Sequence, residues 1–267
     1  MTRIIGRRGS SPPPSRHLSR LDALRSFSIA DLRACPAGDG VRIAIVDSGV
    51  ASSMLADGAS VAVRQAGLLA AVEPCPPGDV HHHGTAVASI LRDLAANARL
   101  TSVRVVDELG RGSAAALRTA LEFCVRERFD VVNLSLGTRK RELLLDVYDL
   151  VDRAAVAGVV LVCATDNVGT PDYPAACTSL IAVDRLAAED PYTLRFRDGH
   201  RIGFLARGED VEVTAPAGGT HRVTGASFAC AHVAAFAARL LASRPGLKPF
   251  EVKTALHAAA ASVSGPS

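Results

Sequence analysis

Three polar residues, Asp47, His83 and Ser227, have the side-chain types that nucleophilic catalysis requires. A serine hydroxyl needs a base to take its proton, and the base needs a carboxylate that fixes its tautomer and stabilises its charged form. The three residues supply one group of each kind. They predict a Ser-His-Asp arrangement if the fold brings these distant positions together.

The sequence around each residue supports this prediction. Asp47 follows the β-rich run 41–46 and precedes a Ser-Gly turn. His83 stands at the start of an apolar-periodic helix, where the positive end of the helix dipole disfavours the imidazolium and keeps the ring available as a base. Ser227 lies in a run of small residues at a helix start, where its hydroxyl is accessible and backbone N–H groups can stabilise an oxyanion.

Each fragment also has a simpler interpretation. An aspartate after a strand is often a turn residue or a helix cap, and a serine at a helix start is often an ordinary N-cap. His81 and His82 are interpreted as solvated loop residues. No metal site is predicted, because adjacent histidines point in different directions and no H-E-x-x-H pair or close Cys or carboxylate pattern completes a ligand shell.

The elements that must position these residues alternate between β-rich runs and helical patterns. This alternation is typical of parallel strands joined by crossover helices, and it predicts an α/β domain with a mainly parallel sheet. Strands are predicted at 41–46, 100–106, 131–136, 159–164, 180–183 and 211–215, and helices at 84–96, 117–125, 143–157, 233–241 and 250–261. Ligands bind at the carboxyl ends of parallel strands, which is where Asp47 falls.

The chain order Asp, His, Ser and the motifs around these residues resemble the subtilase family of subtilisin-like serine peptidases. The segments that carry the resemblance are the aspartate motif at 45–49, the histidine motif at 83–88, the serine motif at 225–229, the substrate strand at 132–137, the oxyanion segment at 163–167, and the Y-P-A and A-P-G positions at 173–175 and 215–216. Ala226 stands where the family's G-T-S-x-A serine motif has Thr. The resemblance implies a three-layer subtilisin-like α/β fold, with a mainly parallel central sheet flanked by helices.

Carried over residue by residue, the resemblance implies a serine endopeptidase that works through an acyl-enzyme without a cofactor. Ser227 would attack the scissile carbonyl, His83 would transfer the proton and Asp47 would hold His83. The side chain of Asn167 and the backbone N–H of Ser227 would bind the oxyanion.

The resemblance also implies that the substrate backbone adds as a strand between two segments of the chain. The residues expected to bind it are Ser135, Leu136, Gly137, Gly110 and Gly112. The last two glycines have the simpler interpretation of a turn. Asp166 stands where the family usually has glycine, and it either favours a basic residue before the scissile bond or faces solvent. The short connection at 96–99 predicts no calcium site.

The composition of the chain argues against several other classes of protein. With 30 basic and 27 acidic residues, the net charge of +3 is too even for a dedicated nucleic-acid binder. No apolar run approaches the ~20 residues of a membrane helix, and no N-terminal segment resembles a secretory signal. The six cysteines form no close pairs. We therefore expect free thiols in a reducing compartment, and a cytoplasmic location.

Residues 1–40 are predicted to form a basic, partly disordered arm with one or two short helical turns, and residues 41–267 the peptidase domain. The expected partner is a peptide or protein substrate, in particular a dedicated precursor peptide from which a leader is removed. Transpeptidation or cyclisation on the same three residues, and a peptide-binding pseudopeptidase, remain as alternatives.

Overall fold

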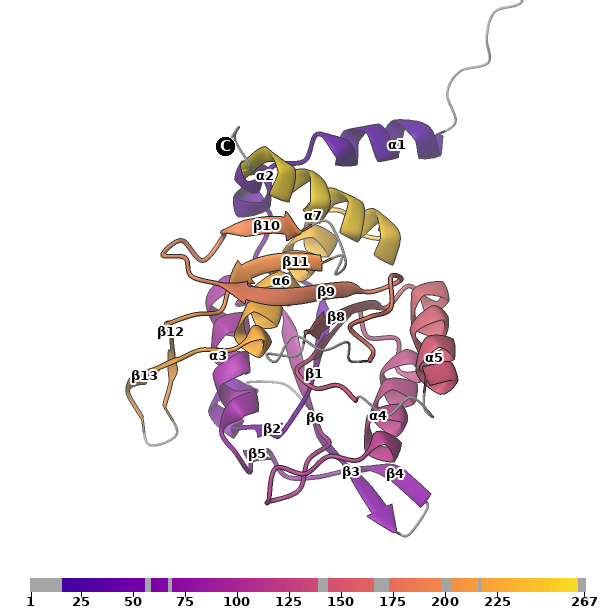
Figure 1. The fold of residues 1–267 in the computed structure, drawn as a ribbon, viewed down its shortest axis with the longest axis vertical. Helices are drawn as coiled ribbons and strands as arrows, with labels where there is room; N and C mark the ends of the chain where they lie inside the picture. The colour runs from indigo at the N-terminus through magenta and orange to yellow at the C-terminus, as the bar shows by residue number, and fades with distance from the viewer. Residues whose placement is uncertain are drawn as a thin grey trace, which may run out of the picture.

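The computed structural model of the protein describes residues 16–55, 59–66, 69–138, 144–165, 173–197, 203–215 and 218–263. At its centre lies a nine-stranded sheet with the order β10-β11-β9-β8-β7-β1-β6-β3-β4 (Figure 1). Its strands are β1 (Arg42–Asp47), β3 (Ser60–Ala66), β4 (Leu69–Pro74), β6 (Arg99–Arg104), β7 (Val131–Leu134), β8 (Val160–Ala164), β9 (Ile181–Leu186), β10 (Leu194–Arg197) and β11 (Gly203–Arg207).

The strand pairs inside this sheet are parallel, and only the outer pairs β3–β4 and β10–β11 are antiparallel. The prediction of a mainly parallel sheet is confirmed. The sequence did not indicate β3, β4, β10 or β11; of these outer strands, β4 and β10 are only partly buried. In β4, for example, half-buried and exposed residues alternate. Fully buried strands such as β8 carry the continuous apolar runs that sequence patterns detect.

The strand predicted at 211–215 is β12 (Val211–Thr214), and its expected place in the central sheet is wrong. It pairs antiparallel with β13 (Thr220–Val223) in a separate two-stranded sheet. Gly218 and Gly219 have φ angles of +91° and +76°. Glycine tolerates such angles, so the chain reverses at once and β12 pairs with the segment that follows it. A second small pair joins β2 (Gly49–Val50) to β5 (Gly78–Asp79).

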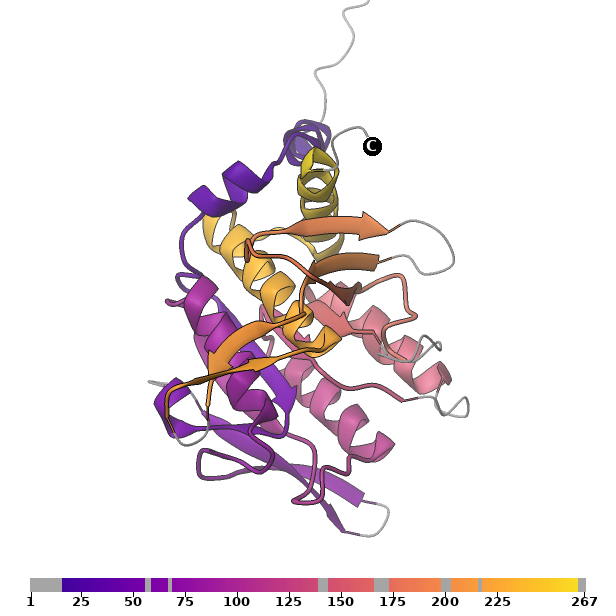
Figure 2. The same ribbon diagram turned by 60° about the vertical axis from the view of Figure 1, so that its left-hand side comes forward.

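Helices cover both faces of the central sheet, which gives three layers (Figures 1 and 2). One face carries α3 (His83–Leu94), α6 (Ala226–Ser243) and α7 (Pro249–Val263), and the other carries α4 (Ala114–Arg126) and α5 (Leu144–Ala157). Side chains of β1 alternate between the two cores: Ile43 and Ile45 pack on the α3 side, whereas Ala44 and Val46 pack on the α4 side. Gly158 ends α5 with a φ of +84°, as predicted.

Helix α6 forms the centre of the first core. It is 18 residues long and apolar enough by length and composition to cross a membrane, contrary to our expectation that no run has this character. In the fold, 83% of this segment is buried. Buried small residues such as Ala231, Ala234 and Ala235 let α6 pack closely against α3 and the sheet. We therefore interpret α6 as the core helix of the domain.

The N-terminal part of the described chain also belongs to this core. Helices α1 (Arg16–Arg25) and α2 (Ile29–Ala34) and the connection between them contribute Leu24, Phe27 and Leu32, which are at most 3% exposed. A capping box begins α2, in which Ser28 and Asp31 exchange side-chain and backbone hydrogen bonds. The hydrophobic core therefore includes residues well before Val41, the position at which the sequence analysis placed the start of the folded domain.

A buried arginine joins α2, α3 and α6 at one end of the molecule. Arg239 of α6 donates hydrogen bonds to the carbonyl oxygens of Leu32, Arg33 and Cys35, at the end of α2, and of Leu94, at the end of α3. The last carbonyls of a helix have no partner within the helix and carry the negative end of its dipole. A guanidinium is suited to this place because it presents several donors in a fixed fork.

Replacing Arg239 by Met should lower the free energy of unfolding by about 3 kcal/mol, because buried carbonyls then lose their donors. Urea denaturation followed by circular dichroism measures the change. The matched control is Arg126→Met on the exposed surface of α4, which should change stability by less than about 0.5 kcal/mol. Equal stability of the two variants would show that the arginine does not hold the three helices together.

Candidate active site

The end of β1 and the first turn of α3 meet at the candidate site. Asp47 is the last residue of β1 and is 4% exposed, and His83 is the first residue of α3. Nδ1 of His83 donates to Oδ1 and Oδ2 of Asp47 at 2.8 and 3.0 Å. The backbone N–H of Ser48 also donates to Oδ1 at 2.7 Å. The carboxylate therefore orients the imidazole and leaves Nε2 as its proton acceptor.

Ser227, the second residue of α6, completes the arrangement. Its Oγ donates to Nε2 of His83 at 2.8 Å. The ring of Phe228 lies 5.3 Å from the imidazole, centroid to centroid, and borders its other side. The structure thus brings together, in one hydrogen-bonded chain, the three residues that the sequence singled out.

Two glycines allow α3 to approach β1 this closely. A Cβ on Gly84 would lie 2.1 Å from the carbonyl oxygen of Gly49 and 3.1 Å from Cβ of Asp47. A Cβ on Gly49, whose φ is +111°, would lie 2.1 Å from the carbonyl oxygen of Gly78. The first turn of α3 therefore packs on bare backbone, and any side chain at Gly84 would push His83 away from Asp47.

A similar contact positions Ser227. The N–H of Gly225, which precedes α6, donates to the carbonyl of Gly208 at 2.8 Å. A Cβ on Gly208 would lie 2.8 Å from the carbonyl oxygen of Gly225 and 2.9 Å from Cβ of Ala229. The loop after β11 is therefore held against the first turn of α6, which fixes the direction of the serine side chain.

Asp79, which the sequence analysis missed, organises the segment before His83. Its carboxylate accepts hydrogen bonds from the backbone N–H groups of His81, His82 and Thr85, at 3.1, 2.8 and 2.7 Å. It also accepts the hydroxyls of Ser48 and Thr85, at 2.7 and 2.6 Å. These bonds hold the end of β1 and the start of α3 together. The only sequence signal was an aspartate shortly before a histidine at a helix start.

Ser135 has a contact that its sequence context did not indicate. It was expected to bind the substrate backbone, but its hydroxyl donates to the carboxylate of Asp47. The side chain of the fully buried Asn133 in turn donates to Oγ of Ser135 at 3.1 Å. Ser135 therefore helps to hold Asp47 from the side of β7.

Burial and the contact between His83 and Asp47 together determine the pKa values of these two side chains. Burial opposes the charged imidazolium, but the charge and hydrogen bond of Asp47, together with the charge of Asp79, raise the pKa of His83 above its usual value. Burial likewise opposes the carboxylate of Asp47. The charge and hydrogen bond of His83 and the donors of Ser48 and Ser135 outweigh it, so the pKa of Asp47 is lowered. Asp47 thus stays ionised and favours the protonated imidazolium.

The start of α6 presents backbone donors to the space beside Ser227. The N–H of Ser227 has no acceptor among the residues that the structure describes, as is usual in the first turn of a helix. The positive end of the helix dipole favours negative charge here. Asn167, the second predicted oxyanion donor, and Asp166 lie outside the described residues.

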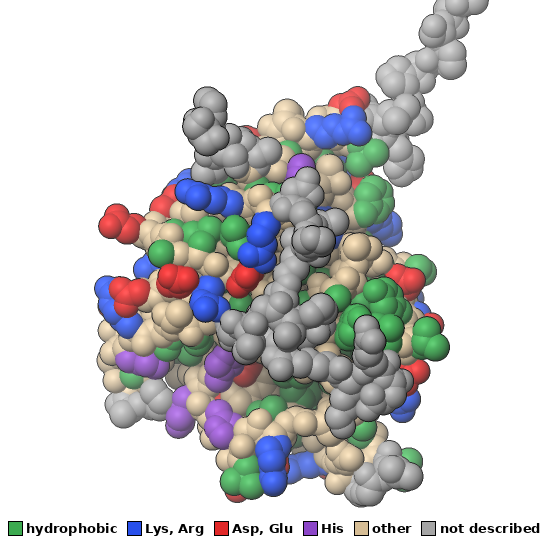
Figure 3. All heavy atoms as spheres, viewed as in Figure 1, with side chains coloured by type: hydrophobic (Ala, Val, Ile, Leu, Met, Phe, Trp, Pro, Cys, Tyr) green, Lys and Arg blue, Asp and Glu red, His purple; other side chains and the backbone are tan. Residues whose placement is uncertain are grey.

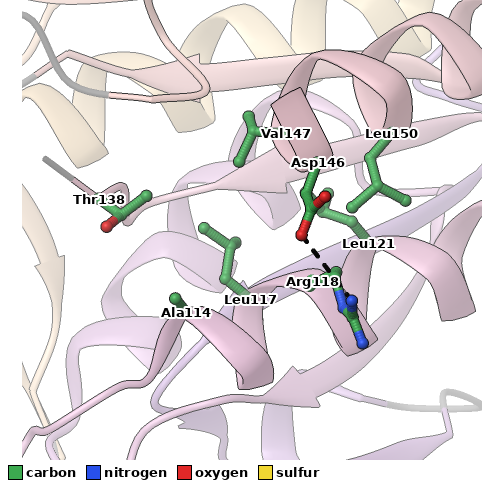
Figure 4. Close-up of a pocket in the computed structure, with 8 residues that line it drawn as sticks. All are labelled: Ala114, Leu117, Arg118, Leu121, Thr138, Asp146, Val147 and Leu150. Atoms are coloured by element: carbon green, nitrogen blue, oxygen red, sulfur yellow. Dashed lines mark ion pairs between the residues drawn. The ribbon is translucent and has the colours of Figure 1, made fainter. Parts of the chain in front are cut away.

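The residues expected to bind the substrate backbone do not themselves line the hollow between α4 and α5, but sequence neighbours of two of them do. Leu136 is half-buried, whereas Gly137, Gly110 and Gly112 are exposed. The residues that line the hollow are Ala114, Leu117, Arg118, Leu121, Thr138, Asp146, Val147 and Leu150 (Figure 4). Thr138 directly follows Gly137, and Ala114 lies just beyond Gly112. The hollow between α4 and α5 has a volume of about 10 Å³, the space of a single water.

Gly110 and Gly112 also lie in a turn, which was the simpler interpretation of these glycines in the sequence. The N–H of Gly110 donates to the carbonyl of Asp107, and that of Asp107 donates to the carbonyl of Arg111. Gly110 has a φ of +71°, and the ring of His81 lies against it. The glycines therefore shape the loop whatever else they contact.

The three neighbouring histidines do not form a metal cluster in the described part of the chain. Nε2 of His81 lies 3.2 Å from the carbonyl of Asp107, and His82 has a left-handed backbone with φ 61°. The imidazole rings of these histidines therefore point in different directions. Figure 3 shows histidine side chains gathered on the lower left of the face that it displays, with basic side chains below them.

Comparison with known proteins shows the family to which the chain belongs. The sequence model of the subtilase family matches residues 38–267, so the chain belongs to this family. It is 29% identical over 238 residues to Subtilisin E of Bacillus subtilis, which covers 84% of this chain and 61% of the relative. Identity to Subtilisin of Bacillus pumilus is also 29% over 238 residues, with 84% of each protein covered. This chain thus spans less than two thirds of the length of some relatives.

The structure shows the same fold. It matches the solved structure of the S41 psychrophilic protease with a TM-score of 0.69, 24% identity and 82% of each chain covered. The predicted three-layer subtilisin-like fold is confirmed.

Gly84→Ala should reduce the reactivity of Ser227 about a hundredfold, because the added Cβ displaces His83 and shifts of about 1 Å have effects of this size. The rate of covalent reaction with a fluorophosphonate, followed by intact-protein mass spectrometry, measures the loss. Gly78→Ala is the matched control, since a Cβ there meets nothing within 4 Å. If both variants react like the wild type, the glycine contact does not position the histidine.

Proposed function

We propose that the protein is a serine endopeptidase that hydrolyses peptide bonds through an acyl-enzyme. The observation that carries the proposal is the continuous hydrogen-bonded chain from Ser227 Oγ through His83 to Asp47. A hydroxyl, a base and an orienting carboxylate at hydrogen-bond distance are what nucleophilic attack on a carbonyl requires. Membership in the subtilase family supports the same activity.

The geometry supports a defined course of proton transfer. Nε2 of His83 takes the proton of Ser227 as Oγ attacks the scissile carbonyl, and the ionised Asp47 stabilises the imidazolium. The N–H of Ser227, together with Asn167, receives the oxyanion. The imidazolium then gives its proton to the leaving amine, and the acyl-enzyme remains. Water, activated by the same nitrogen, releases the acid product and restores the serine.

We infer that the substrate is an extended peptide lying between the segments that contain Gly110 and Gly137. The hollow in Figure 4 supports this placement, because residues next to both segments line it. Its apolar wall of Leu117, Val147 and Leu150 offers contacts to an apolar side chain that lies beside it.

We further propose that the enzyme processes a dedicated precursor peptide in a reducing compartment such as the cytoplasm. All six cysteines are unpaired, and five are buried. Burial raises the pKa of Cys177 to about 11, which keeps this thiol protonated and unreactive. Buried reduced thiols of this kind fit a reducing compartment. The small hollow supports selectivity for particular sequences.

A fluorophosphonate should label the folded protein at Ser227, and Ser227→Ala should abolish both labelling and peptide cleavage. Peptide mapping identifies the labelled residue, and the urea-unfolded protein is the control that should not react. Absence of labelling in the folded wild type would contradict the proposal and favour a peptide-binding role. Mass spectrometry of the products separates hydrolysis, which adds water, from transpeptidation, which joins a second peptide.

The acid limb of the profile of kcat/KM against pH should have its midpoint above 6.5, the usual value for histidine. Only neutral His83 accepts the serine proton, so a raised pKa means that activity is lost at a higher pH as the solution is acidified. Asp47→Asn removes the charge that stabilises the imidazolium and should move the midpoint downward, besides lowering the rate. A midpoint that does not respond to this substitution would show that Asp47 does not tune His83.

A further inference from the structure

The loop that contains Gly110 lines a second hollow. Its volume is about 390 Å³, far larger than that of the hollow between α4 and α5. The residues that line it are Arg64, Val80, Arg104, Val106, Asp107, Glu108, Leu109 and Arg111. Charged side chains therefore form most of its wall.

The hollow adjoins the catalytic residues. Arg104 ends β6 and is the register partner of Asp47 at the end of β1, so their Cα atoms lie about 5 Å apart. Partners in neighbouring strands direct their side chains to the same face of the sheet. Val80, which also lines the hollow, precedes His83 by a few residues. A peptide bound with its scissile bond at Ser227 thus passes beside this hollow.

The positive charges of the hollow are only partly neutralised. Arg111 forms an ion pair with Asp107, in which Nη2 lies 3.1 Å from Oδ2. The side chains of Arg64 and Arg104 have no hydrogen-bond or ion-pair partner among the described residues. Glu108, on the exposed loop, is the other acidic side chain of the wall, and it too has no partner there. Two guanidinium groups therefore face a cavity that holds less negative charge than positive.

We propose that this hollow is a subsite for an acidic side chain of the substrate, with Arg64 and Arg104 as the residues that determine specificity. The proposal rests on the proposed peptidase function. Guanidinium groups present fixed donors that match a carboxylate, and charge-assisted hydrogen bonds of this kind are stronger than neutral ones. Arg104 is half-buried, so a carboxylate that reaches it is partly screened from water. The preferred substrate thus carries Asp or Glu close to the cleaved bond.

The test compares peptides that carry Glu or Gln, one position at a time, on either side of the cleaved bond. At one position the wild type should cleave the Glu peptide with a kcat/KM about tenfold higher at low salt, and less so as salt rises. Arg64→Gln combined with Arg104→Gln should bring the Glu/Gln ratio close to one. Arg104→Glu should make Lys preferred over Gln at that position, a gain that misfolding cannot produce.

Arg99→Gln is the matched control. Arg99 lies at the other end of β6, is exposed, and should keep the wild-type ratio after losing the same charge. A ratio near one at every position in the wild type, or an unchanged ratio in the double variant, would overturn the proposal.

Binding separates this proposal from the catalytic one. Fluorescence anisotropy of the same peptides on the Ser227→Ala variant should show about tenfold tighter binding of the Glu peptide, and loss of this difference when Arg64 and Arg104 are also replaced. This result can hold even if the wild type cleaves no peptide, which would contradict only the peptidase function. Conversely, cleavage without any Glu preference would contradict only the subsite.

Discussion

The contact between the first turn of α3 and the end of β1 is the constraint on which the site depends. Gly84 packs on the carbonyl of Gly49, so that His83 reaches the carboxylate of Asp47 at 2.8 Å. Asp79 reinforces this contact with hydrogen bonds to both sides of it. A hydrogen-bonded ion pair works only at this short range, because its strength depends on distance and alignment. The packing of backbone on backbone therefore sets the chemistry of the histidine.

The helix that carries Ser227 is positioned from both of its ends. At the start of α6, the loop with Gly208 holds Gly225 and so directs Ser227. Towards its end, Arg239 ties α6 to the last carbonyls of α2 and α3. The small residues of α6 let it lie against α3 along their length, side by side in Figure 2. Because two helices packed in this way move as one body, the helix starts that carry His83 and Ser227 keep their spacing.

Much of this architecture was predictable from local patterns. The buried strand β8 is a continuous apolar run, β1 contains one, and α3 carries an apolar stripe at helical spacing. Asp47, His83 and Ser227 were recognised because each stands at a strand end or helix start and because their order resembles a known family. The outer strands β3 and β4 escaped prediction, since their apolar stretches are short and partly exposed strands pair according to what lies beside them.

The sequence by itself determined the order of the elements, the buried faces and the identity of the three catalytic candidates, because these depend on residue type and spacing along the chain. Only the tertiary structure decided which groups surround them. The hydroxyl of Ser135 was found to donate to Asp47, and Asp79 was found to tie the end of β1 to the start of α3. The juxtaposition of Arg64 with Arg104 arises from the pairing of β3 with β6. Such contacts join positions far apart in sequence, and no local pattern records which strand will lie beside which.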